Sequence, residues 1–243
     1  ARHDAGDFSK QNRFFEQIKF LEKNNKISMC GSWVKETSLS GISLGTTSFP
    51  KTDSEIKNSI LYQNAFCHGS IMAKKDDIMQ LNGYREEFKH SQDYDLWLRL
   101  TESCKVANLE ETLYVRTISP ESISFANKEK QKAYADLARD CYRARKLKTK
   151  EPLHRFESID RAQSKINNQN RIHSIYKFYC GRKLFSHGKM RLARKYFFNS
   201  LYLFPFGLKN IVFIFFTLLP QGIRKVFEKI WLSKKAKYNL RID

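Results

Sequence analysis

The segment at residues 90–100 places two carboxylates at the start of an apolar stretch, where acids can take part in catalysis. Asp93, Leu96 and Trp97 fall at i, i+3 and i+4, so a helix over this segment carries them on one face. The free N–H groups of the first helical turn favour an ionised Asp93, whereas partial burial beside Trp97 opposes ionisation. A carboxylate held between these two effects can act as a general base. The structural alternative is that Asp93 or Asp95 only caps the helix.

The elements that must position these residues follow the pattern of a layered α/β protein. A helix is predicted over 8–25, with Phe14, Phe15, Ile18 and Leu21 on its inner face, and it is followed by a buried strand over 27–34. The remaining predicted elements are a surface loop at 37–53, helices at 55–62 and 75–81, and strands at 66–73, 106–108 and 112–116.

The positive charge of the chain lies in its second half. Residues 1–120 contain 16 Lys and Arg and 16 Asp and Glu, whereas residues 121–243 contain 28 and 9. This asymmetry predicts a neutral domain followed by a basic module that meets an anionic surface, either lipid headgroups or nucleic acid. Nucleic acid is the less favoured partner, because the aromatic residues gather in apolar runs rather than between the basic residues.

Composition narrows the class of protein further. With 41% hydrophobic residues among 243, the chain can bury a sizeable core, which excludes disorder throughout. Its five cysteines form no CxxC pair, so we expect reduced thiols and a cytoplasmic protein. The chain starts at Ala1 without a secretory signal, and we expect it to be part of something longer.

The second half is predicted to be helical. A basic helix with an apolar inner side is predicted over 128–150. Residues 172–185 and 190–203 are predicted to form two antiparallel helices joined at His187 and Gly188. This pattern resembles a single tetratricopeptide-like helical hairpin.

Residues 204–223 form the most apolar stretch of the chain. Its centre at 211–219 is shorter than the roughly 20 residues that cross a bilayer. Basic residues flank this centre, with Lys209 before it and Arg224, Lys225, Lys229, Lys234, Lys235 and Lys237 after it, together with Trp231. We predict a helix that lies in the plane of a membrane surface, and a buried helix packed on the hairpin is the alternative.

Two ordered motifs carry a resemblance to a known family. The first motif is Ala1-Arg2-His3-Asp4-Ala5-Gly6-Asp7 followed by Asn12-Arg13-Phe14. The second is Asn82-Gly83-Tyr84 leading to Gln92-Asp93-Tyr94-Asp95-Leu96-Trp97-Leu98-Arg99, with His68-Gly69-Ser70 between the two. Over about residues 1–125 the chain resembles family-two glycosyltransferases of the GT-A fold. The resemblance implies an inverting transferase that uses a nucleotide-sugar donor.

The resemblance also implies a divalent metal, Mg²⁺ or Mn²⁺, on the donor diphosphate. Asp4 matches the first acid of the family's Asp-x-Asp motif, whereas the third position is Gly6 and the next acid is Asp7. Carboxylate oxygens suit hard cations that neutralise a diphosphate. We therefore expect Asp4 and Asp7 to hold the metal, and Asp4 also to serve the donor. A turn followed by a helix cap is the structural alternative.

The pair Gln92 and Asp93 corresponds to the family's Glu-Asp pair, whose aspartate resembles the base that deprotonates the acceptor hydroxyl. We therefore assign Asp93 as the base and expect Gln92, His68 and Trp97 on the acceptor side. A core position for Trp97 and a structural role for His68 are the alternatives.

Two further residues follow from the same comparison. Arg116, in the run Tyr114-Val115-Arg116, is expected to contact the diphosphate. Asp95 and Arg99 lie four residues apart and are expected to form a supporting ion pair.

The expected fold is α/β, a truncated GT-A sheet lacking its N-terminal half, followed by an α-helical C-terminal extension. The expected domains are a transferase half at 1–125, a basic helical linker at 126–169, a helical hairpin at 170–205 and a basic membrane-associating tail at 206–243. In the family the donor's nucleotide is held mainly by units before the first motif, so we expect this chain alone to bind nucleotide-sugar weakly.

We expect a transferase of surface polysaccharide or lipopolysaccharide biosynthesis, acting on a glycan or lipid-linked acceptor. Its expected location is peripheral, on the inner face of a membrane, where a basic tail would meet anionic lipid. The alternatives are a non-catalytic basic binding module and a degenerate transferase kept as a scaffold, at an anionic membrane or RNA.

Overall fold

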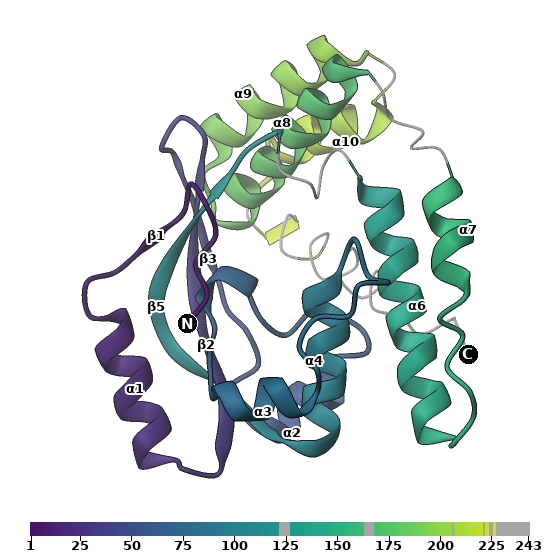
Figure 1. Cartoon of the computed structure of the whole chain (residues 1–243). Coiled ribbons are helices and arrows are strands. Elements are labelled where there is room, and N and C mark those ends of the chain that lie inside the picture. The colour runs from purple at the N-terminus through teal and green to yellow at the C-terminus, as the bar shows by residue number, and fades with distance from the viewer. Residues whose placement is uncertain (122–126, 163–167, 206, 221, 224–225, 227–243) are drawn as a thin grey trace. The chain divides into compact units, whose positions relative to one another are not determined.

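We describe residues 1–121, 127–162, 168–205, 207–220, 222–223 and 226 of a computed structural model of the chain (Figure 1). The chain forms two compact units. The first contains residues 1–36, 46–117 and 127–165, and the second contains residues 37–45, 118–126 and 166–243. Strands and helices alternate through the first unit, whereas helices dominate the second. The chain is therefore a mixed α/β protein.

A five-stranded sheet runs in the order β1, β5, β2, β3, and β4 pairs with β2 off this path. The strands are β1 (Phe8–Ser9), β2 (Ile27–Ser38), β3 (Ser43–Thr47), β4 (Met72–Ala73) and β5 (Lys105–Ile118). β1 runs antiparallel to β5 with Phe8 opposite Val115, and β4 runs antiparallel to β2 with Met29 opposite Ala73. The segments just before β1 and just before β4 are thereby attached to adjacent strands, β5 and β2.

The strands differ from the prediction in four places. Residues 8–9 of the helix predicted over 8–25 form β1, and of the strand predicted at 66–73 only residues 72–73 are extended, as β4. The expected loop at 37–53 contains the end of β2 and all of β3, because its Ser and Thr residues adopt extended backbone around a turn at Gly41, where φ is 76°. The two short strands expected at 106–108 and 112–116 are one strand, β5. This strand continues through Glu110 and Glu111, whose charges stay exposed to solvent.

Four α-helices and a short 3-10 turn complete the sheet-bearing part of the first unit. They are α1 (Arg13–Lys23), α2 (Asp53–Ser59), the 3-10 turn (His68–Ser70), α3 (Lys75–Gln80) and α4 (Gln92–Ser103). α4 occupies the segment predicted from residues 90–100, and Trp97, Leu98 and Leu100 are fully buried in the main core. A capping box of Thr52 and Glu55 starts α2.

Helix α1 buries a face that differs from the predicted one. Phe14, Phe15 and Ile18 are exposed, whereas Arg13 and Gln17 are fully buried. These polar side chains can be buried because they hydrogen-bond to backbone carbonyls. Hydrophobic periodicity cannot identify a buried face of this kind.

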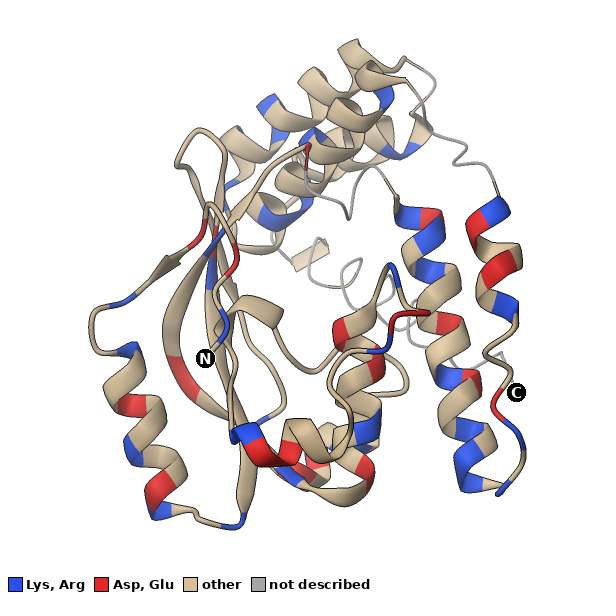
Figure 2. Ribbon diagram, in the orientation of Figure 1, with Lys and Arg blue, Asp and Glu red and all other residues tan. Residues whose placement is uncertain are grey.

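The basic segment after β5 forms α6 (Lys128–Lys146) and α7 (Arg155–Arg161). Tyr134, Leu137 and Cys141 of α6 are buried in the same core cluster as Trp97. The segment 126–169 is therefore more than the expected linker, because the apolar side of α6 belongs to the core of the first unit. Lys and Arg alternate with Asp and Glu along α6 and α7, as Figure 2 shows.

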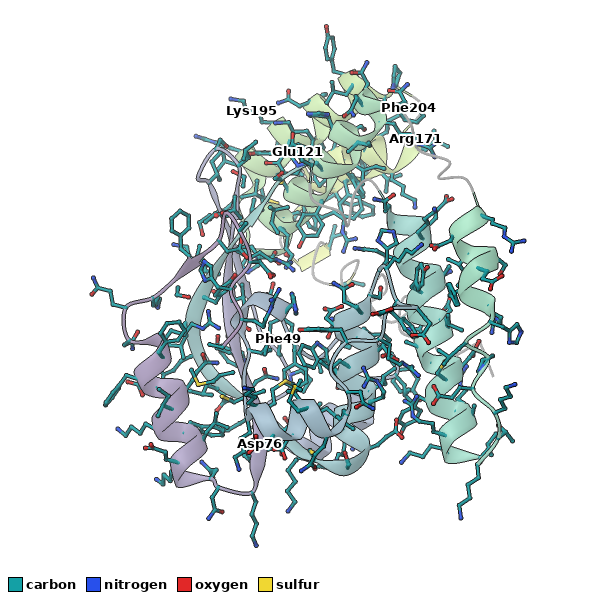
Figure 3. The ribbon with its side chains drawn as sticks, in the orientation of Figure 1. Phe49, Asp76, Glu121, Arg171, Lys195 and Phe204 are labelled. Atoms are coloured by element: carbon teal, nitrogen blue, oxygen red, sulfur yellow. The ribbon has the colours of Figure 1, made fainter. Side chains whose placement is uncertain are left out.

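In the second unit, α8 (Gln169–Ser186) and α9 (Met190–Leu203) pack as a helical hairpin, and α10 (Leu208–Phe216) packs on α9. The turn of the hairpin has Gly188 at a φ of 74°. A Cβ at Gly181 would lie 2.7 Å from the ring of Phe197, so a glycine there lets the two helices approach closely. Arg171 stacks over Phe204 at 5.8 Å, and Figure 3 shows both side chains at the same end of this unit.

In the described part of the chain, no helix is both long enough and apolar enough to cross a membrane. The apolar stretch predicted at 204–223 contains α10, which has one buried and one exposed side. Most of the basic residues expected in the tail lie outside the described residues, namely Arg224, Lys225, Lys229, Lys234, Lys235 and Lys237, together with Trp231.

Candidate active site

The turn at residues 4–7 is the first part of the candidate site, and all of the site belongs to the first unit. The backbone N–H of Asp7 donates to the carbonyl of Asp4 at 3.3 Å, and Gly6 between them has a φ of 82°. A glycine suits this left-handed position because it has no Cβ. The backbone N–H of Asp4 donates to the hydroxyl of Tyr114 at 3.0 Å, which fastens the turn to β5.

Asp7 is held by the same strand. Its carboxylate Oδ1 accepts the backbone N–H of Thr117 at 2.8 Å. Burial raises the pKa of Asp7, the bond from Thr117 partly offsets that rise, and the charge of Asp4 adds to it. The Asp7 carboxylate is therefore bonded to β5 and does not cap α1, whose cap position is Asn12.

His68 joins Asp4 to a second loop. Its Nδ1 lies 3.1 Å from Oδ1 of Asp4, and its Nε2 lies 3.0 Å from the hydroxyl of Tyr84. Because a carboxylate only accepts hydrogen bonds, the proton of Nδ1 points at Asp4. The bond with His68 is the main cause that lowers the pKa of Asp4 below its usual value. His68 therefore orients Asp4 and links it to Tyr84.

A glycine makes this arrangement possible. A Cβ at Gly69 would lie 2.1 Å from the hydroxyl of Tyr114 and 3.0 Å from Oδ2 of Asp4. Tyr114 is fully buried, and Val34, Cys67 and the partly buried Phe49 pack around it. The tyrosine that holds Asp4 thus has little freedom to move away.

Asp93 lies in the first turn of α4 and does not cap it. The cap position is Ser91, whose φ is 55°, and it makes no side-chain capping bond. Oδ2 of Asp93 accepts a hydrogen bond from Asn64 at 3.3 Å, and the side chain is partly exposed. Burial raises the pKa of the Tyr84 hydroxyl, and the charges of Asp93 and Asp4 raise it further. Tyr84 therefore lies within electrostatic reach of both proposed site acids.

Gln92 is partly exposed beside Asp93 at the start of α4. Trp97 is fully buried, edge-to-face with Phe66 at 5.8 Å and 6.4 Å from the ring of His68. Because no ring face of Trp97 is accessible for a sugar to stack on, Trp97 is not an acceptor contact as expected. It packs next to His68 instead. The core alternative describes this residue better.

Arg116 makes an ion pair with Glu36, a fully buried carboxylate on β2. The side chain of Arg116 is 39% exposed. Its positive charge offsets part of the rise that burial causes in the pKa of Asp7. The arginine expected at the diphosphate therefore already has a carboxylate partner.

Two residues of α1 position the site and were not identified from the sequence. Arg13 donates to the carbonyl of Arg2 at 2.7 Å and to that of Ile71 at 3.2 Å. Gln17 donates to the carbonyl of Ser70 at 2.9 Å. These bonds tie the segment that carries Asp4 to the one that follows His68. Arg13 stands in the Asn12-Arg13-Phe14 run of the first motif, where no role was assigned to it, and Gln17 follows four residues later on the same side of the helix.

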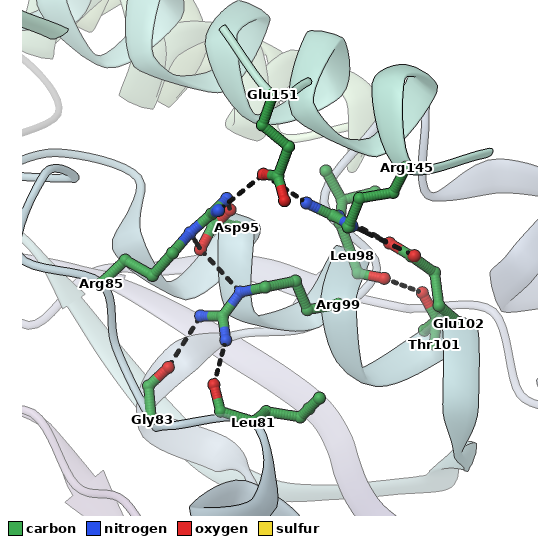
Figure 4. Close-up of polar contacts among 10 residues, drawn as sticks. All are labelled: Leu81, Gly83, Arg85, Asp95, Leu98, Arg99, Thr101, Glu102, Arg145 and Glu151. Atoms are coloured by element: carbon green, nitrogen blue, oxygen red, sulfur yellow. Dashed lines mark hydrogen bonds and ion pairs between the residues drawn. The ribbon is translucent and has the colours of Figure 1, made fainter. Parts of the chain in front are cut away.

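A network of ion pairs joins α4 to the loop before it and to the segment after α6 (Figure 4). Asp95, with no exposed surface, pairs with Arg85 and with Arg99, whose Nε lies 3.0 Å from Oδ2. Arg99 also donates to the carbonyls of Leu81 and Gly83, each at 2.7 Å. The loop that carries Tyr84 is thus fixed to the helix that carries Asp93. The Asp95–Arg99 pair was expected from its spacing, and the structure contains it.

The donor set of the site suits one mode of metal binding. No group of three His, Cys, Asp or Glu side chains able to cage a metal occurs among the described residues. Mg²⁺ commonly binds through one or two carboxylates and completes its shell with phosphate oxygens and water. Asp4 and Asp7, joined by one turn and both near Tyr114, fit that mode.

A surface hollow elsewhere in the first unit shares no residue with the site. Its volume is about 350 Å³, and Lys26, Asp77, Cys104 and Lys105 are among the residues that line it. Asp4, Asp7, His68 and Asp93 are not among its lining residues.

No family profile matches the chain. Individual curated proteins do match. The chain is 31% identical over 123 residues to the UDP-Gal:alpha-D-GlcNAc-diphosphoundecaprenol beta-1,3-galactosyltransferase of Escherichia coli, covering 50% of this chain and 44% of that protein. It is 32% identical over 116 residues to the O-antigen biosynthesis glycosyltransferase WbnJ of the same organism, covering 46% and 44%.

A third relative is the putative glycosyltransferase EpsE of Bacillus subtilis, 32% identical over 118 residues that cover 47% of this chain and 41% of that protein. The chain spans less than half the length of the curated relatives it matches. All three relatives are named as glycosyltransferases, and the mixed α/β fold is consistent with such an enzyme. The similarity therefore supports a glycosyltransferase family for this chain.

Proposed function

We propose that the protein transfers a sugar, with inversion, from a nucleotide-diphosphate donor to a hydroxyl of a glycan or lipid-linked acceptor. Asp93 is the general base that takes the proton of the attacking hydroxyl. Inversion requires only a single in-line displacement, so one base on the acceptor side suffices. Asp93 suits that role because it is partly exposed, has one amide partner in Asn64, and lies in the first turn of α4.

The donor side of the site consists of the turn at residues 4–7. Asp4 and Asp7 would hold Mg²⁺ or Mn²⁺, which when bound neutralises charge on the leaving diphosphate. His68 holds Asp4 in place and Tyr114 holds the backbone of the turn, so the carboxylate is oriented before the donor arrives. The partly exposed guanidinium of Arg116 is the proposed contact to the diphosphate.

The contacts of Tyr84 carry this proposal. Tyr84 hydrogen-bonds His68, which orients Asp4, and the charges of Asp93 and Asp4 both act on its hydroxyl. The proposed base and the proposed diphosphate-binding acid thus both act on one tyrosine, which supports a single site for donor and acceptor. Gln92, beside the base, is the proposed acceptor contact.

The relatives suggest where to look for substrates. Two are named for O-antigen synthesis or for a diphosphoundecaprenol acceptor, so surface polysaccharide or lipopolysaccharide is the proposed product class. A uridine-diphosphate sugar is the first donor to test, because the name of one relative specifies UDP-Gal.

Substitution D93N tests the proposed base. In the full-length gene product we expect release of nucleoside diphosphate from the donor to fall about 100-fold or more, since positioned bases contribute at least that much. Chelation of divalent metal with EDTA should abolish the release by wild-type protein. Asp93→Asn should leave thermal unfolding and donor binding, measured by calorimetry, unchanged.

Asp76→Asn is the matched control, because Asp76 is also an acid in the first turn of a helix and is exposed on α3 (Figure 3). We expect D76N to transfer sugar at the wild-type rate. Undiminished transfer by D93N would remove Asp93 as the base, and a wild-type protein that binds but never transfers would favour the scaffold alternative.

A further inference from the structure

Helix α10 presents an apolar face that no described residue covers. Leu208, Ile211, Val212, Phe215 and Leu218 are 75%, 51%, 43%, 57% and 62% exposed. Their spacing of three and four residues places them on one side of the helix and its continuation. We name this set of five side chains the α10 ridge. Leaving so many large apolar groups in water is unfavourable unless something covers them.

The opposite side of α10 is fixed to the second unit. Phe213 is buried against Phe178, Phe185 and Phe197, with ring centroids 5.2–5.6 Å apart. Arg194 of α9 donates from Nε to the hydroxyl of Thr217 at 3.0 Å and from a terminal nitrogen to its carbonyl at 3.3 Å. The α10 ridge is therefore held by a packed helix, on the side that no described residue covers.

The charge around the ridge identifies what it meets. Residues 166–227 contain no Asp or Glu, and between 166 and 220 the chain has nine Lys and Arg. Figure 2 accordingly shows Lys and Arg but no acidic residue on α8, α9 and α10. Exposed cations such as Lys195 on α9 (Figure 3) and Lys209 on α10 belong to this set.

We propose that the α10 ridge inserts into the interface of an anionic lipid bilayer, with α10 lying in the membrane plane. At about 1.5 Å per residue, α10 is about 14 Å long, which suits lying along a surface. A helix satisfies its own backbone hydrogen bonds, so a ridge without polar side chains loses none on entering acyl chains. Lys209 on α10 and the other cations of α8 and α9 add attraction to acidic headgroups.

A second copy of the chain is a poorer occupant of this face. The second unit is strongly positive, so bringing two such faces together opposes like charges. Anionic lipid supplies both the apolar phase and the opposite charge. This proposal is independent of the transfer chemistry, because it concerns the second unit and is tested by binding alone.

Vesicle co-sedimentation of the full-length protein tests the proposal. Wild-type protein should sediment with vesicles of equal parts phosphatidylcholine and phosphatidylglycerol, and added salt should weaken this binding. The double variant I211D/F215D should bind these vesicles roughly 10- to 100-fold more weakly, because two apolar side chains no longer enter the lipid. Both positions are exposed, so the thermal unfolding of the variant should match that of wild type.

The matched control is F15D, which changes a phenylalanine of similar exposure, 64%, on α1 of the first unit. F15D should bind vesicles as wild type does. Absence of wild-type binding to the anionic vesicles, or equal binding by I211D/F215D, overturns the proposal. Concentration-dependent dimers that I211D/F215D abolishes, measured by light scattering without lipid, also overturn it in favour of a second copy.

Discussion

Asp4 is positioned from three directions. Its backbone N–H donates to the hydroxyl of Tyr114, and its Oδ1 accepts a hydrogen bond from His68. Its Oδ2 would lie only 3.0 Å from a Cβ at position 69. The absence of a Cβ at Gly69 is therefore as important to the site as the polar groups. Since Tyr114 is fully buried, it cannot yield to a larger residue at low energetic cost.

Substitution G69A should destabilise the fold by about 1–3 kcal/mol, the usual range for overpacking. The new Cβ would overlap the hydroxyl of Tyr114 and push it from the Asp4 backbone. Urea unfolding followed by circular dichroism measures the change. The control is G222A, because a Cβ at Gly222 has nothing within 4 Å and no destabilisation is expected. Equal stability of G69A and wild type would show that Tyr114 moves freely.

At the scale of elements, α4 combines two roles. Its apolar side chains fill the core, and its N-terminal turn carries Asp93 and the buried Asp95. Asp95 connects α4 to Arg85 of the preceding loop, and Arg85 in turn contacts Glu151 at 2.6 Å (Figure 4). The loop, the helix and the segment after α6 are thus held by one set of charges.

Substitution D95N should lower the free energy of unfolding by about 3–5 kcal/mol, because it leaves buried guanidinium groups without their carboxylate. The matched control is D136N, which breaks the pair of Asp136 with Arg139 on α6. Asp136 is 38% exposed, and the loss there should stay under about 1 kcal/mol. Denaturant unfolding of both variants gives the comparison, and similar losses would mean that burial of Asp95 adds nothing.

Only part of this network is predictable from spacing. The Asp95–Arg99 pair follows from the helical i, i+4 rule and needs no tertiary information. Arg85 and Glu151 are 10 and 56 residues from Asp95, so the fold alone brings them together. For the same reason hydrophobic periodicity predicts Phe14, Phe15 and Ile18 on the inner face of α1, whereas Arg13 and Gln17 are buried there because the carbonyls they bind come from distant segments.

At the scale of the whole molecule, the chain separates its two kinds of surface. The first unit contains the proposed site, and the second contains a helix with one face in an aromatic core and one face exposed. The two alternatives for residues 204–223 therefore describe opposite sides of α10. Its inner side is a packed helix, and its outer side is the proposed lipid-binding ridge.

A pair of alanine substitutions separates these two sides. F213A should destabilise the protein by about 3–5 kcal/mol, because it leaves a cavity among Phe178, Phe185 and Phe197. F215A should change stability by less than about 0.5 kcal/mol, because Phe215 is 57% exposed. Thermal unfolding of the two variants measures this difference. Equal effects would mean that α10 has no distinct inner side.

The sequence by itself determined the α/β fold class, the helix of the proposed base and the distribution of charge. These features depend on periodicity and composition, which are local and survive without contacts. The tertiary structure alone decided that His68 orients Asp4, that Tyr84 connects it to the neighbourhood of Asp93, and that Trp97 is core. The physical reason is that hydrogen bonds and burial between distant segments depend on chain topology, on which spacing within a motif carries no information.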